Sequence, residues 1–307
     1  RAEAEIGRAC KKFARENQLA VTAVALVNNS FKNSAAYKGD ETGGYFKEIS
    51  CDFNDTGKLS QILSELSKEK LVFHCRMEEA IKDFIKVVSL VPEVLAPTAE
   101  ALANSTEKYA MRRKISASFP EICPKFVSLS NAGQLDESLL LGFNFPVIVK
   151  PNGLHSSFFV TKCHDLNELK TCVQEVFNQL NDVYTREYGT GKPSLLIEEF
   201  MHGDMYSVDA YTNTHGKVTC LPLFRVVTAA ELGLDGYYSY RHIVPTDLNE
   251  AEVQEAKICA EKAITALNLK SSAAHVELYK TDMGWKIIEL GPRMGGYRQE
   301  LYWEAFG

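Results

Sequence analysis

The chain contains 307 residues, of which 45% are hydrophobic and 24% are charged, and its formal net charge at pH 7 is −6. This composition is typical of a folded globular protein, and the length is enough for about two domains. The chain is acidic and has no long basic run, so nucleic acid is not an expected partner. No apolar stretch approaches the ~20 residues that cross a bilayer, so a membrane is not expected either.

The N-terminal third alternates between helical and strand patterns. The helical patterns lie at 2–14, 59–66 and 78–91, and the strand patterns lie at 19–28 and 70–75. This alternation predicts a small parallel α/β unit. It contains no G-x-G-x-x-G string, so we do not expect a dinucleotide site there.

A linker at 91–105 is followed by a second series of elements. A basic helix is predicted before Pro120, and apolar segments at 145–160, 194–200 and 206–228 have the character of strands. Two further helices are predicted from their starts, because an Asp or Asn is followed three residues later by Glu in the spacing of an N-cap. These starts are Asp165 with Glu168 and Asn249 with Glu252.

The segment "HVELYKTDMGWKIIEL" is predicted to form a β-hairpin, because two runs of β-branched and aromatic residues flank "TDMG". A three-residue loop that ends at Gly284, in a left-handed conformation, would place Thr281 opposite Trp285. In that register Glu277 lies directly opposite Glu289.

Directly opposed side chains lie roughly 5 Å apart at Cβ, and like charges there destabilise the strand pair. A divalent cation would neutralise them, since Mg²⁺ takes oxygen ligands from one or two carboxylates and from substrate phosphates. Glu277 and Glu289 are therefore candidate metal ligands. Two alternatives stay open: a slip of one residue would separate the acids onto opposite faces, or both belong to a solvated acidic face.

Lys150 ends an apolar strand and precedes Pro151-Asn152-Gly153. Its ammonium group, the turn and the hydroxyls of Ser156 and Ser157 could together bind phosphate. The alternative is an ordinary solvated lysine at the end of a strand.

Glu198 and Glu199 are adjacent in a predicted strand, so they point to opposite faces and one of them faces inward. An inward carboxylate needs hydrogen-bond donors. Either an adenine amino group or a structural arginine would supply them.

Arg293 follows the hairpin and is placed to stabilise oxyanion charge, or to pair with one of the two hairpin glutamates. Other basic residues are candidates for contact with a substrate, each with an ordinary structural role as the alternative. They are Arg225, Arg241, His242, His275 and Arg298.

Eight cysteines are scattered along the chain without a C-x-x-C pair. This pattern indicates reduced thiols in a cytoplasmic protein rather than a disulfide framework or a zinc site. No signal peptide is recognisable at the start of the chain, which fits the same expectation.

In chain order, a lysine after an apolar strand, "IEEF", "YSVDAY", a helix and "HVEL…IIELGPRMGG" resemble the ATP-grasp superfamily over about residues 107–307. The branch most similar is the carboxylate–amine ligases, which include L-amino-acid (dipeptide) ligases and carnosine-synthase-like enzymes. The resemblance implies an α/β (α+β) ATP-grasp fold. It implies a pre-ATP-grasp domain at 1–105, a lid subdomain at 106–196 and a C-terminal subdomain with the metal site at 197–307, the last two clasping ATP between antiparallel sheets.

The resemblance also assigns roles to matching positions. Lys108 and Lys150 are similar to the lysines that contact ATP phosphates. Glu198, Glu199 and the backbone of Met201 are similar to the segment that holds adenine.

Glu277 and Glu289 resemble the magnesium-binding acids of the superfamily, with Mn²⁺ as the alternative ion, and Arg293 resembles the arginine beside the transferred phosphate. The implied activity is ATP-dependent ligation of a carboxylic acid to an amine. The reaction would pass through an acyl phosphate and release ADP and phosphate.

Two positions and one loop depart from the family pattern. Gly291 stands where the family often has a metal-binding asparagine, and Met205 stands where a ribose-binding acid is usual. Asp204, one residue earlier, is the candidate substitute for that acid. The loop at 151–160 is also poorer in glycine than most.

Two other functions are consistent with this resemblance. A non-catalytic ATP-binding module, as in synapsin-like proteins, is favoured by Gly291 and Met205. A bicarbonate-activating carboxylase-type subunit is disfavoured because no biotin-carrier segment is recognisable. The expected partners are a small-molecule acid and amine, with amino acids among the candidates, and a homodimer is one assembly that the sequence allows.

Overall fold

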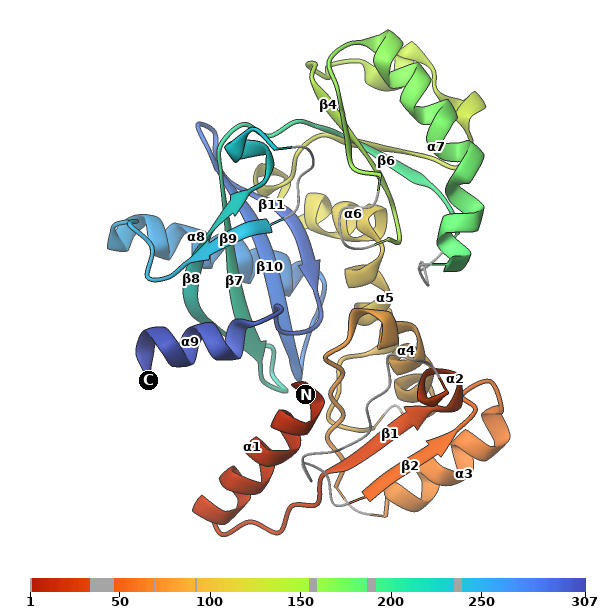
Figure 1. Ribbon diagram of the computed structural model, residues 1–307, viewed down its shortest axis with the longest axis vertical. Coiled ribbons are helices and arrows are strands. Elements are labelled where there is room, and N and C mark those ends of the chain that lie inside the picture. The colour runs from red at the N-terminus through yellow and green to blue at the C-terminus, as the bar shows by residue number, and fades with distance from the viewer. Residues whose placement is uncertain are drawn as a thin grey trace. The chain divides into compact units, whose positions relative to one another are not determined.

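The computed structural model of the chain describes residues 2–33, 47–68, 70–91, 93–154, 159–186, 192–234 and 239–307. The chain divides into two compact units, Arg1–Leu95 and Ala96–Gly307, which are described separately below (Figure 1). The finer division into domains at 1–105, 106–196 and 197–307 stays a prediction. Ser156 and Ser157, which we expected near phosphate, lie outside the described residues.

The first unit is built on two parallel strands, as the alternating pattern predicts. Its main elements are α1 (Ala2–Glu16), β1 (Val24–Asn28), α2 (Asn29–Lys32), β2 (Lys47–Cys51), α3 (Thr56–Leu66) and α4 (Ile81–Leu90). Leu59 and Leu63 of α3 and Val87 of α4 pack against Cys51 of β2. This small apolar cluster holds the helices on the strand pair.

The prediction of a strand at 70–75 is wrong. In its place the chain forms one parallel bridge, between Val72 and Leu95. Val72 is 70% exposed, so the apolar run does not bury its side chains as a core strand would.

The second unit contains two antiparallel sheets. The four-stranded sheet has the order β3-β6-β4-β5. Its strands are β3 (Phe126–Leu129), β4 (Val147–Pro151), β5 (Thr161–Cys163) and β6 (Leu195–Glu199). Figure 1 shows α7 (Leu166–Arg186) lying along this sheet, and its buried positions, such as Leu169, Val173 and Val176, follow the helical repeat. Asp165 caps the helix as predicted, because its Oδ1 accepts from the backbone N–H of Glu168 at 3.0 Å.

The five-stranded sheet has the order β11-β10-β7-β8-β9. Its strands are β7 (Asp204–Thr212), β8 (Val218–Thr228), β9 (Ser239–Ile243), β10 (Ser272–Thr281) and β11 (Gly284–Gly291). Helix α8 (Glu250–Ala266) packs on one face and begins with the predicted capping box of Asn249 and Glu252. Further α-helices of this unit are α5 (Ala99–Thr106), α6 (Lys108–Ser118) and α9 (Arg298–Phe306).

Strand alternation separates the core of this sheet from its polar face. Val276 and Leu278 of β10 belong to the apolar cluster under α8. Their neighbours His275 and Glu277 therefore point to the other face, where the site described below is found.

The hairpin of β10 and β11 differs from the prediction at its turn. Thr281 pairs with Gly284, not with Trp285, and Gly284 takes the expected left-handed conformation with a φ of +89°. A bulge then shifts the register by one residue, so that Glu277 lies opposite Glu289 as predicted.

No helix within the described ranges has both the length and the apolar character needed to cross a membrane.

Candidate active site

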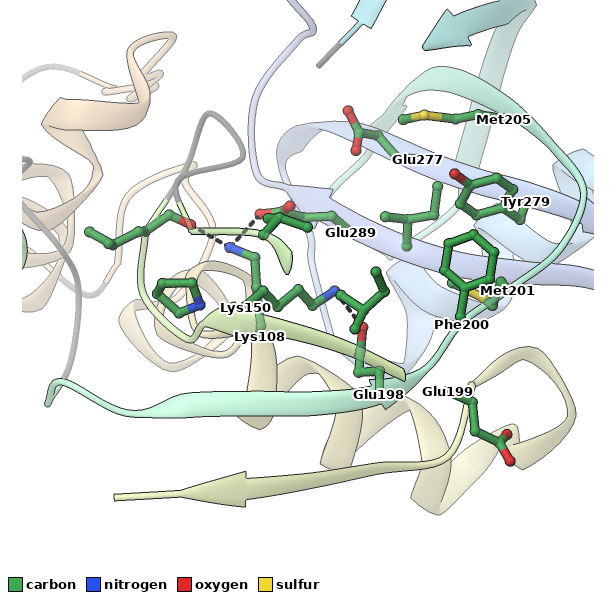
Figure 2. A pocket seen from close by; sticks show the side chains of 15 residues that line it. Lys108, Lys150, Glu198, Glu199, Phe200, Met201, Met205, Glu277, Tyr279 and Glu289 are labelled. Carbon is green, nitrogen blue, oxygen red and sulfur yellow. Dashed lines mark hydrogen bonds and ion pairs between the residues drawn. The ribbon is translucent and has the colours of Figure 1, made fainter. Parts of the chain in front are cut away.

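A pocket lies between the two sheets of the second unit (Figure 2). One wall comes from β4, β6 and the residues after β6, and the other comes from β7, β10 and β11, with the start of α6 at one end. The lining residues are Lys108, Ile148, Lys150, Pro151, Leu154, Val160, Glu198, Glu199, Phe200, Met201, Met205, Glu277, Tyr279, Ile288 and Glu289. The pocket is therefore charged at one end and apolar along much of its length.

Glu277 and Glu289 form the acidic part of the pocket. Nζ of Lys108 lies 3.1 Å from Oε1 of Glu289, and Nε2 of His275 lies 3.6 Å from Oε1 of Glu277. Each acid thus has a cationic neighbour supplied by the protein. The protein itself therefore supplies part of the compensation that the sequence led us to expect from a divalent cation.

Glu277 is held in its ionised form. Burial alone would raise the pKa of Glu277, but the neighbouring His275 and further positive charges outweigh burial and lower it. Burial alone would lower the pKa of His275, but the carboxylates of Asp209 and Glu277 raise it. Each of the two groups therefore favours the charged form of the other.

The two glutamates fit a magnesium ion by the chemistry of their donor atoms. Both offer carboxylate oxygens from one face of the hairpin into the same pocket. Among the residues that the structure describes, no group of three or more His, Cys, Asp or Glu side chains is arranged to hold a metal. A metal held here would therefore complete its shell with phosphate and water oxygens, which is how Mg²⁺ is commonly bound.

Both predicted lysines reach the pocket. Lys108 is 6% exposed at the start of α6, and its Nζ donates to the carbonyl of Leu154. Lys150 is also 6% exposed, and its Nζ lies 2.5 Å from Oε2 of Glu198. Figure 2 shows both ammonium groups near the acidic end.

Glu198 is the inward-facing member of the predicted pair, with 2% of its surface exposed. Its partners are Lys150 and Arg112, whose Nε donates to Oε1. Burial alone would raise the pKa of Glu198, but these two cations lower it. A structural arginine is therefore present, which is one of the two alternatives left open by the sequence.

Arg112 is a site-forming residue that the sequence interpretation missed. It is fully buried, and its Nη2 also donates to the carbonyl of Ile288 at 2.6 Å. A signal was present, because Arg112 lies with Lys108, Met111 and Ile115 on one buried helical stripe. A charged residue on such a stripe needs a buried partner.

Two residues predicted to contact nucleotide, Glu199 and Asp204, have ion-pair partners within the protein. Glu199 borders the pocket, but its side chain is directed away from the acidic end and lies 3.2 Å from Nζ of Lys125 (Figure 2). Asp204 does not line the pocket, because it points to the other side of β7 from Met205 and lies 2.7 Å from Nη2 of Arg225. Met201 lines the pocket.

The candidate substrate residues are spread over a wider region. Arg225 is held by Asp204 and Glu231, and Arg241 is exposed on β9. His242 is half-buried, and burial, helped by the charge of Arg298, lowers its pKa to about 4.

His275, Arg298 and Arg293 lie nearer to the acidic pair. Both His275 and Arg298 are buried and face Asp209. Arg293 donates from Nη1 to the carbonyl of Met294 at 2.9 Å, and its charge helps to lower the pKa of Glu277.

Known relatives share parts of this chain. It is 22% identical over 247 residues to the alanine–anticapsin ligase of Bacillus amyloliquefaciens, covering 72% of this chain and 52% of that protein. It is 30% identical over 145 residues to the D-alanine–D-alanine ligase of Acetivibrio thermocellus, covering 45% of this chain and 34% of that protein. The chain thus spans about half, or less, of the length of these curated relatives.

A similar solved structure is the L-amino acid ligase from Bacillus licheniformis. The TM-score is 0.68 at 19% identity, over 94% of this chain and 66% of that one, which shows a common fold. A family model described as the ATP-grasp domain matches residues 143–300, which is about half of the chain and carries most of the pocket. The chain belongs to the ATP-grasp family.

Proposed function

We propose that this chain binds ATP in the pocket between its two sheets and uses it to join a carboxylic acid to an amine. The observation that carries the proposal is the acidic pair, Glu277 and Glu289, in one pocket with two buried lysines, Lys108 and Lys150. This is an arrangement that suits a triphosphate with its metal.

The apolar part of the pocket supports a site for the base of the nucleotide. Phe200, Met201, Met205 and Tyr279 line it. These side chains offer a shape-selective surface to a flat heterocycle, whereas the charged end would hold the phosphates. Glu198 is already engaged by Arg112 and Lys150, so its proposed part is to hold Lys150 in place.

In the proposed reaction a substrate carboxylate oxygen attacks the γ-phosphorus of ATP, and the bond to the β,γ-bridging oxygen breaks to release ADP. The product is an acyl phosphate. The amine nitrogen then attacks the acyl carbon, loses a proton, and inorganic phosphate leaves as the amide forms. Each step conserves atoms and needs no redox partner.

The chain's own residues act mainly by position and charge. Lys108 and Lys150 would orient the phosphates, and Glu277 and Glu289 would hold Mg²⁺ or Mn²⁺. The ion, when bound, neutralises charge on the phosphoryl oxygens. Arg293, whose charge acts on Glu277, would stabilise the oxyanion that forms when the amine attacks.

Amino acids are the substrate class that we propose for both the acid and the amine. The names of the relatives support this choice, since alanine occurs in both ligases reported above. Small-molecule substrates and a cytoplasmic location complete the proposal, the latter supported by free cysteines in the described structure.

The experiment is a screen of acid and amine pairs for ADP release with Mg²⁺. We expect at least one amino-acid pair to stimulate ADP release, and Glu289→Gln to abolish it. Tight ATP binding without ADP from any pair would favour a non-catalytic module. ADP release that depends on bicarbonate would favour a carboxylase-type reaction.

A further inference from the structure

A carboxylate with no exposed surface, that of Asp209, lies in the middle of the polar face of the five-stranded sheet. Its Oδ1 accepts from Nδ1 of His275 at 2.9 Å and from the backbone N–H of Gly295 at 2.8 Å. Its Oδ2 lies 3.2 Å from Nε of Arg298, an ion pair without the alignment of a hydrogen bond. One side chain thus joins β7, β10 and the segment after β11.

Through His275, Asp209 is connected to Glu277 of the acidic pair. His275 lies opposite Asp209 in the strand register, and Nε2 of its ring lies 3.6 Å from Oε1 of Glu277. Because Asp209 engages Nδ1, the other ring nitrogen is directed toward Glu277. Asp209 therefore fixes the group that neighbours a proposed metal ligand.

The contact of Asp209 with Gly295 bears on the position of Arg293. Gly295 and Arg293 belong to the same short segment, between the end of β11 and the start of α9. The hydrogen bond from Gly295 to Asp209 anchors that segment on the sheet. It thereby limits where the guanidinium of Arg293 can lie.

The close packing at Gly295 is an independent sign of the same arrangement. A Cβ added there would lie 2.7 Å from Nδ1 of His275 and 2.8 Å from Nε of Arg298. Arg298 cannot easily move aside, since its Nη2 donates to Ser207 at 2.6 Å and its guanidinium lies 4.1 Å from the ring centre of Phe224. Only glycine lets the backbone approach this closely.

We propose that Asp209 is a positioning residue for the site of the metal-bound triphosphate. It orients Glu277 through His275, and it holds the segment that carries Arg293 through the N–H of Gly295. This inference rests on the proposed function, because it takes Glu277 as a metal ligand. Outer partners of metal ligands typically contribute about 10–100-fold to metal affinity. Asp209 acts here without contacting the metal.

The first test measures how strongly Mn²⁺ tightens the binding of an ATP analogue with an NH bridge between its β and γ phosphorus atoms. The analogue is titrated into the protein in a calorimeter, once in buffer with Mn²⁺ and once in buffer with EDTA. The affinity for the analogue with Mn²⁺ divided by the affinity with EDTA is called the Mn²⁺ ratio below. We expect Asp209→Ala to reduce this ratio by about 10-fold or more, with little change in EDTA. Asp209→Asn should lose less, because it keeps an acceptor oxygen.

Thr212→Val is the matched control for a change that is only structural. Thr212 is a buried polar residue on the same strand, β7, and its hydroxyl exchanges hydrogen bonds with Ser272 of β10. We expect it to lower the melting temperature while leaving the Mn²⁺ ratio within about twofold of the wild-type value.

A second pair of variants tests the arrangement without touching the carboxylate. Gly295→Ala adds a methyl group that must displace His275 or Arg298, whereas Gly296→Ala meets no atom within 4 Å. We expect Gly295→Ala to reduce the Mn²⁺ ratio by about 10-fold and Gly296→Ala to leave it unchanged. This pair also decides the question if Asp209→Ala does not fold.

The outcomes separate this inference from the proposed function. If the wild-type protein binds the analogue equally with Mn²⁺ and EDTA, the metal site itself is wrong and the inference is overturned with it. If the wild type shows the Mn²⁺ effect and both Asp209→Ala and Gly295→Ala keep it, the positioning role alone is overturned.

Discussion

Arg112 has no exposed surface, yet it carries a full charge between the two sheets of the second unit. Its Nε donates to Glu198 of the four-stranded sheet, and its Nη2 donates to the carbonyl of Ile288 in the five-stranded sheet. The same Glu198 holds Lys150. Arg112 therefore links the two sheets and, through Glu198, helps to hold Lys150, the lysine that we propose binds phosphate.

Removing the guanidinium should leave Glu198 with one buried cation in place of two. We expect Arg112→Met to lower the free energy of unfolding by about 3 kcal/mol, because loss of one partner leaves a buried charge poorly compensated. Urea unfolding followed by tryptophan fluorescence measures this change. Both tryptophans, Trp285 and Trp303, lie in the second unit, so the signal reports that unit.

The neighbouring Arg113 supplies the control. It is exposed on the same helix, α6. Arg113→Met should change the unfolding free energy by no more than about 0.5 kcal/mol. Equal effects of the two substitutions would contradict the structural account of Arg112.

At the scale of single residues, the sequence predicted which side chains gather in the pocket better than what each of them contacts. Strand alternation and a short turn, which are local rules, predicted the pairing of Glu277 with Glu289, although the observed register also depends on a bulge that they did not predict. The partnership of Arg112 with Glu198 joins residues 86 positions apart, and no local pattern specifies it. The sequence also did not specify which side of β7 Asp204 takes; Met205 lines the pocket and Asp204 does not, and a role of Asp204 at the ribose stays a prediction.

The hairpin shows the same limit at the scale of elements. Its turn is one residue shorter than predicted, and the bulge between the turn and the acidic pair restores the expected register. Two departures thus cancel, since each changes the pairing by one residue. The strand predicted at 70–75 was wrong. An apolar run forms a strand only if a neighbouring strand pairs with it, and here the pairing is limited to the single bridge between Val72 and Leu95.

Helix starts were predicted well, because capping depends on residues that are close in sequence. Asn249 accepts from the N–H of Glu252 at 3.0 Å, and Glu252 accepts from the N–H of Asn249 at 2.9 Å. This capping box begins α8, which covers the apolar face of the sheet that carries the acidic pair.

Asn249→Ala should therefore destabilise the second unit by about 1 kcal/mol, the usual cost of losing an N-cap. Asn249→Asp keeps the acceptor oxygen and should retain most of the stability. The tryptophan signal during urea unfolding again provides the measurement, and an unchanged midpoint in Asn249→Ala would show that the cap contributes little here.

At the scale of the whole molecule, every residue that lines the pocket belongs to the second unit. Nucleotide should therefore stabilise that unit directly. At an analogue concentration of about 100 times its dissociation constant, with Mg²⁺, we expect about 2.7 kcal/mol of added stability from mass action.

The tryptophan signal in urea tests this expectation as well, because it reports the second unit alone. The control is the same titration with Lys150→Met, in which the analogue should stabilise the protein much less. Equal stabilisation of Lys150→Met and wild type would indicate binding away from this pocket.

The most direct test of the account is a crystal structure of the chain with the NH-bridged ATP analogue and Mn²⁺, using the anomalous signal of manganese. We expect a manganese peak that contacts a carboxylate oxygen of Glu277, one of Glu289 and the phosphate oxygens, with the base beside Met201 and Phe200. A nucleotide bound elsewhere, or manganese away from both glutamates while the analogue fills the pocket, would contradict the account.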